Sequence, residues 1–128
     1  MDDAHDPGFL AALERGIELF NEQRFFEAYE VWSERWSEEG GDGSDLLQGL
    51  IQISVGLAKL TGGNAKGTVK LLESGAQKIG PYAPHAYDLD IDALLVLIRQ
   101  WRDVAAETLA RGNPVAGMPQ AALQKKKS

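Results

Sequence analysis

The residues best placed to do chemistry are carboxylates and amides at helical spacing. Glu27 and Glu30 lie three positions apart, so in a helix they share one face beside the phenol of Tyr29. A carboxylate in a buried place must find hydrogen-bond donors or stay protonated, and enzymes prepare general acids and bases in this way. Gln48 and Gln52 lie one turn apart in the next predicted helix and can supply amide donors. We therefore predict a polar cluster of these five residues, with one of the two carboxylates partly buried.

Such a cluster has two interpretations. A satisfied network of polar groups fixes how helices pack, and this structural role is the favoured one because perturbed carboxylates mark function only statistically. The other interpretation is a binding or hydrolytic site in which Glu27 or Glu30 acts beside Tyr29 and Gln52.

Composition excludes several classes of function. The chain has no cysteine, which removes disulfides, thiolate nucleophiles and cysteine zinc sites. Its two histidines, His5 and His85, are isolated from each other, so we predict no catalytic triad, no metal and no cofactor. The formal charge of −6 includes three lysines at 125–127, which leaves −9 on residues 1–111. This acidic body disfavours nucleic acid as a partner.

The length and the ends of the chain predict a simple organisation. The 128 residues suit one domain, and no apolar run reaches the roughly 20 residues that span a membrane. The acidic start is unlike a secretory signal, so we expect a cytoplasmic protein. We expect a flexible N-terminus over 1–6, a single helical domain over 7–111 and a flexible tail over 112–128.

Apolar residues recur every three or four positions, which predicts an all-α bundle of five helices, or at most six. We expect helices over about 7–20, 24–36, 46–60, 64–79 and 91–111, with Asp6, Ser44 or Asp45, Asn64, and Asp90 or Asp92 as N-caps. The first two are joined by a short connection and should pack antiparallel. No segment shows the two-residue alternation of a strand, so no sheet is predicted.

The third predicted helix, Leu46–Leu60, is apolar on most sides, which is typical of a helix surrounded by others. Gly49 and Gly56 lie on one side of it and each costs up to about 1 kcal/mol of helix propensity, so we expect a neighbouring backbone to approach there. Only a narrow polar line runs along this helix, formed by Gln48, Gln52 and Lys59.

The three tryptophans are given different roles. Trp32 and Trp101 lie on apolar stripes and are expected in the core. Trp36 lies beside an acidic loop and is the candidate for an interface or the rim of a pocket.

Two motifs carry a family resemblance. The run LFNEQRFFEAYEVW over 19–32, followed by Trp36, precedes LLQGLIQI over 46–53, with Gly63, Asn64 and Gly67 after it. In this order they resemble the bacterial and archaeal family called domain of unknown function 309, over roughly residues 9–79. The resemblance implies a compact helical domain in which one central helix is ringed by the others, and it implies no established activity.

The chain departs from the family pattern at polar positions. Members usually read Phe-Phe-Glu-x-His-Glu-x-x-Glu in the second helix, where this sequence has Tyr29 for the histidine and Ser33 for the later glutamate. The histidine position of the third helix holds Ala58 or Lys59. A metal-dependent version of that site is therefore not expected, since a phenol is protonated near neutral pH and is a poor metal ligand.

Three hypotheses follow for function. The first is a non-enzymatic protein-interaction or oligomerising domain that forms a homodimer, because the bundle is small, acidic and rich in aromatic residues. The second is a small-molecule binding or hydrolytic domain that uses the polar cluster. The third is a tetratricopeptide-like peptide-binding module, which would require a grooved solenoid instead of a closed bundle.

Overall fold

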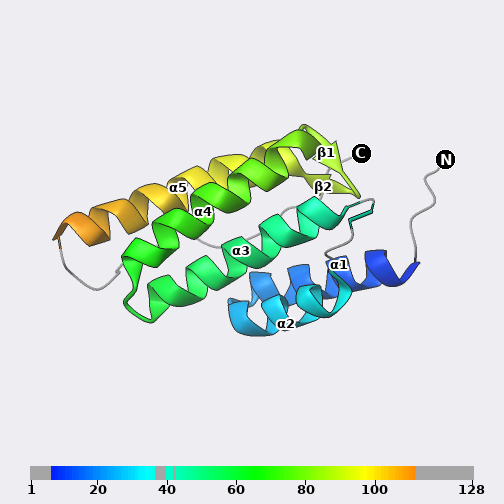
Figure 1. The fold of residues 1–128 in the computed structure, drawn as a ribbon, viewed down its shortest axis with the longest axis horizontal. Helices are drawn as coiled ribbons and strands as arrows, with labels where there is room; N and C mark the ends of the chain where they lie inside the picture. The colour runs from blue at the N-terminus through cyan, green and yellow to red at the C-terminus, as the bar shows by residue number, and fades with distance from the viewer. Residues whose placement is uncertain (1–6, 37–39, 42, 112–128) are drawn as a thin grey trace.

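The computed structural model describes residues 7–36, 40–41 and 43–111, and these form five α-helices with one small hairpin (Figure 1). The predicted flexible ends, 1–6 and 112–128, and the predicted cap Asp6 lie outside the described residues. The elements are α1 (Pro7–Asn21), α2 (Phe25–Arg35), α3 (Ser44–Thr61), α4 (Ala65–Ile79), a 3-10 turn η1 (Gly80–Tyr82), β1 (His85–Ala86), β2 (Leu89–Asp90) and α5 (Ile91–Arg111).

Each helix packs against the next one in the chain, and α3 lies between α2 and α4 (Figure 1). The first and last helices also meet, because the ring of Phe20 in α1 lies 5.7 Å from that of Trp101 in α5. This contact closes the five helices around one core. The all-α bundle predicted from the sequence is therefore confirmed, and an open solenoid is not formed.

The core is built from the apolar stripes of all five helices. Trp32 and Trp101 are fully buried, which confirms their predicted place. Trp32 lies directly over Gly16 of α1, and its indole nitrogen donates to the carbonyl of Leu13 at 3.4 Å. Because a side chain at Gly16 would occupy the space of the indole, the glycine lets the two helices approach.

The α3–α4 contact is the tightest in the fold. A methyl group added at Gly75 would lie 2.9 Å from the carbonyl oxygen of Gly49, and one at Gly49 would lie 3.0 Å from that of Gly75. About two turns further along α3, the hydroxyl of Thr68 donates to the carbonyl of Gly56 at 2.7 Å. The expected approach of a backbone to Gly49 and Gly56 is thus confirmed, and α4 supplies it.

Two of the predicted helix N-caps are found in the structure, and one is not. Asn64 accepts from the amide of Gly67 at 3.0 Å, and Asp90 accepts from that of Ala93 at 2.9 Å, as N-caps do. The predicted cap of α3 by Ser44 or Asp45 is wrong. The N-cap is Gly43, whose φ of +81° favours glycine, and its missing side chain leaves room for the ring of Phe9.

The prediction that the chain has no sheet is wrong at the hairpin. His85 pairs with Asp90 and Ala86 with Leu89, and each strand has only two residues, which is too short to show alternation in the sequence. The two turn residues, Tyr87 and Asp88, both have positive φ, as the tight turns of hairpins require. The turn holds the ring of Tyr87 5.0 Å from that of Phe9 at the start of α1.

Candidate functional site

Glu27 lies on the surface at the start of α2. Its carboxylate accepts from the guanidinium of Arg24 at 2.6 and 2.5 Å, and its side chain is 48% exposed. These hydrogen bonds favour the charged form and hold the pKa of Glu27 below its ordinary value. Glu27 is therefore ionised at neutral pH and unsuited to donate a proton.

Glu30 is exposed as well, so the expectation that one of the two carboxylates is partly buried is wrong. Its neighbour Tyr29 is half-buried, and the phenol ring lies 5.6 Å from the ring of Phe26 in a tilted arrangement. The second helix thus presents an aromatic pair at this place, with the carboxylates beside it in solvent.

The two glutamines of α3 lie away from α2. Ser54 marks the side of α3 that meets α2, because its hydroxyl donates to the carbonyl of Phe25. With about 100° per residue, Gln52 points about 160° from Ser54 and about 60° from Gly49, which marks the α4 side. Gln52 is half-buried there, and its amide oxygen is buried without a hydrogen-bond partner.

The predicted polar cluster therefore does not form as one network in the described part of the chain. No hydrogen bond there joins any two of its five members, Glu27, Tyr29, Glu30, Gln48 and Gln52. Gln48 is half-buried and points about 120° from Ser54 and about 100° from Gly49, and the two carboxylates are exposed on α2. The spacing in the sequence placed these residues on the right helices, but it did not give the rotation of α3 about its axis.

Trp36, the candidate rim residue, ends α2 and is half-buried against the core. Its indole nitrogen is buried without a partner. Its role at an interface or a rim remains a prediction.

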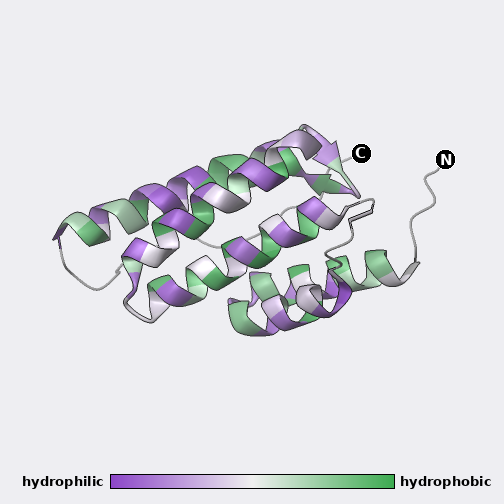
Figure 2. Ribbon diagram, in the orientation of Figure 1, coloured by the Kyte–Doolittle hydropathy of each residue, from purple (hydrophilic) through white to green (hydrophobic). Residues whose placement is uncertain are grey.

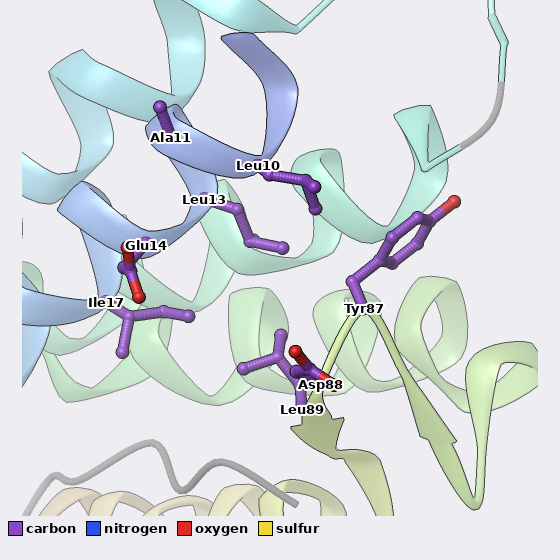
Figure 3. A pocket seen from close by; sticks show the side chains of 8 residues that line it. All are labelled: Leu10, Ala11, Leu13, Glu14, Ile17, Tyr87, Asp88 and Leu89. Carbon is purple, nitrogen blue, oxygen red and sulfur yellow. The ribbon is translucent and has the colours of Figure 1, made fainter. Parts of the chain in front are cut away.

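A groove that the sequence did not reveal lies between α1 and the hairpin (Figure 3). It has a volume of about 450 Å³. Its lining residues come from these two elements alone: Leu10, Ala11, Leu13, Glu14, Ile17, Tyr87, Asp88 and Leu89. Leu13, Ile17 and Leu89 are buried and form its floor, whereas Leu10 is 39% exposed. The stripe of α1 signalled the floor, but nothing in the sequence showed that the hairpin would form the other wall.

A second apolar feature lies on the outer face of α2. Phe26 is 63% exposed, more than the other exposed large apolar residues in the described part of the chain, Leu10, Val96 and Leu109. The first turn of α2 is coloured hydrophobic in Figure 2, at the outer edge of the bundle. Its neighbours Arg24, Glu27 and Glu30 are charged and exposed. This surface of α2 therefore has an aromatic side chain at its centre and charged side chains around it.

Among residues 7–36, 40–41 and 43–111, no three side chains of histidine, aspartate or glutamate are grouped closely enough to hold a metal ion. Within the same ranges, no helix is both long enough and apolar enough to cross a membrane.

Comparison with known proteins supports the resemblance found in the sequence. Residues 13–71 match the family model described as domain of unknown function 309. The matched segment runs from the middle of α1 to the middle of α4, so it includes α2, α3 and the hydrogen bond from Thr68 to Gly56, whereas Gly75 lies beyond its end. No curated protein matches the chain.

Proposed function

Starting from the match of residues 13–71 to domain of unknown function 309, we propose that this helical chain is a protein-interaction domain that forms a homodimer through the outer face of α2. The observation that carries the proposal is the 63% exposure of Phe26. Aromatic side chains are enriched at the centres of protein interfaces, where they bury a large area at a small cost in side-chain entropy.

The aromatic pair suits this role because it is ordered before binding. The tilted contact with Tyr29 holds the Phe26 ring in place, and half-burial of Tyr29 fixes that side chain in turn. An anchor whose rotamer is already restricted loses less entropy when a partner covers it.

The charges around Phe26 suit a second copy of the same chain. Arg24 lies two positions before Phe26, and Glu30 lies four positions after it. In a twofold pair of antiparallel α2 helices, the Arg24 end of one copy faces the Glu30 end of the other, so opposite charges meet on both sides of the aromatic centre. This arrangement adds Glu30 of the second copy to the carboxylates of Glu22 and Glu27, which Arg24 already binds within its own chain.

The hydrolytic hypothesis finds less support. The hydrogen bonds from Arg24 hold the pKa of Glu27 below its ordinary value, which opposes proton donation, and Glu30 is exposed on the surface of α2. Gln52 lies on the opposite side of α3 from Ser54, away from both carboxylates.

Sedimentation equilibrium of the full chain tests the proposal. We expect a reversible monomer–dimer equilibrium that Phe26→Ser weakens at least about tenfold, because fully burying a phenylalanine is worth about 1.5–3 kcal/mol. Val96→Ser is the matched control, since Val96 is 47% exposed on α5 and should leave the equilibrium unchanged. A chain that stays monomeric at high concentration, or a dimer that Phe26→Ser does not weaken, would contradict the proposal.

A further inference from the structure

The groove between α1 and the hairpin combines an apolar floor with an acidic border. Leu13, Ile17 and Leu89 form the floor, and Glu14 and Asp88 bring carboxylates to its edge. The rim residue Leu10 is 39% exposed beside them. An apolar segment that carries positive charge at one end matches both properties of this surface.

The chain itself contains such a segment after α5. Residues 114–124 read PVAGMPQAALQ and have no charged side chain, and Lys125, Lys126 and Lys127 follow directly. Residues 112–128 hold these three lysines and no acid, whereas residues 1–111 carry −9. The charge of residues 112–128 is thus opposite to that of residues 1–111. Pro114 and Pro119 favour an extended conformation, which suits an open groove.

The segment is long enough to reach the groove. The hairpin immediately precedes α5, so the groove lies at the start of that helix, and Arg111 lies at its other end. The 21 residues of α5 span about 30 Å at 1.5 Å per residue. Twelve further residues, 112–123, span up to about 40 Å when extended, which is enough to return along the helix.

We propose that residues 114–124 bind in the groove of the same chain, with the three lysines beside Glu14 and Asp88. The tail is then an internal ligand that covers the apolar floor of this groove. The inference goes beyond the proposed homodimer and uses a different surface, the groove between α1 and the hairpin. A partner that binds in the groove would have to displace the tail.

Paramagnetic NMR on the full chain tests this pairing. Because the chain has no cysteine, Gln124→Cys gives a single site for a nitroxide label. We expect the label to remove most of the amide signal intensity of residues 10–17 and 87–89, and to leave residues 65–70 at the far end of α4 unaffected. Leu10→Asp places a charge on the exposed rim and should restore the lost intensity, as should Leu123→Asp in the tail. A thermal unfolding curve for each variant verifies that the bundle stays folded.

Two controls separate the outcomes. Phe26→Ser removes the proposed dimer contact and should leave the loss of intensity at the groove unchanged, so failure of the homodimer does not affect this test. A mixture of labelled chains with unlabelled, isotope-enriched chains detects contacts between copies. No loss at the groove, a loss that Leu10→Asp does not reverse, or a loss found only between copies would overturn the proposal.

Discussion

The contact between α3 and α4 is closely packed, whereas α1 and the hairpin leave a groove between them. At the α3–α4 contact, Gly49 and Gly75 bring two backbones so close that an added methyl group would lie 2.9–3.0 Å from a carbonyl oxygen. Between α1 and the hairpin, by contrast, side chains leave a groove of about 450 Å³. Backbone-to-backbone packing leaves no room for a groove between α3 and α4. The structure places an open groove and an exposed aromatic pair on α1 and α2.

Truncating a side chain in the floor of the groove should destabilise the fold as a core substitution does, whereas truncating one on its rim should have the small effect of a surface substitution. Leu13 is 2% exposed, so Leu13→Ala should lower the free energy of unfolding by about 3 kcal/mol through lost burial and a new cavity. Leu10→Ala on the rim should lower it by no more than about 0.5 kcal/mol. Chemical denaturation of both variants gives the comparison. If both variants lost the same free energy of unfolding, Leu10 would be as buried as Leu13, and this would contradict an open groove.

The tight contact should resist even a small addition. Gly75→Ala should cost about 3 kcal/mol of overpacking, of which about 1 kcal/mol is regained as helix propensity, for a net loss of about 2 kcal/mol. Gly80→Ala is the matched control because an added methyl group meets nothing within 4 Å there. Thermal unfolding distinguishes the two. A neutral Gly75→Ala would mean that α3 and α4 separate readily.

Hydrogen bonding across the same contact should contribute less than packing. Thr68→Val keeps the shape of the side chain but removes the bond to the Gly56 carbonyl, at an expected cost of about 1 kcal/mol. Thr61→Val is the control, since the Thr61 hydroxyl bonds the Ala58 carbonyl at an exposed place, where water can replace it. Urea denaturation of the pair measures the difference, and equal effects would contradict a special role for the buried bond.

The smallest effect is expected at the exposed ion pair of α2. The pKa of Glu27 is lowered in the folded state by Arg24, so the pair stabilises the fold above the ordinary range of a carboxyl group. That contribution is lost as the pH falls through the lowered pKa. Stability of the wild type and of Glu27→Gln should therefore differ most near neutral pH and converge on acidification. If the difference in stability between the wild type and Glu27→Gln grew as the pH fell, the predicted direction would be contradicted.

The helices could be predicted because their signals are local. The stripes through Trp32 and Trp101, the cap Asn64 and the glycines of α3 each depend on residues within a few turns. The sequence also predicted that Gly49 needs a close neighbour, although it did not show that α4 supplies it.

The site could not be predicted because it depends on how the helices are rotated and on contacts between distant segments. The direction of Gln52 follows from which side of α3 meets α2, and that side is set by Ser54 and Phe25. The groove needs a hairpin whose strands have two residues each, too few to leave a pattern. The cap Gly43 was missed because its conformation and the nearby ring of Phe9 matter more than a side-chain oxygen.

The claim that binding surfaces lie on the α1–α2 side, with self-association through Phe26, is tested most directly by a dilution series of amide NMR spectra. We predict that the signals of residues 26–33 shift as the concentration of the full chain changes, while those of α4, residues 65–79, stay constant. Spectra that do not depend on concentration, or shifts centred on α4, would contradict the account.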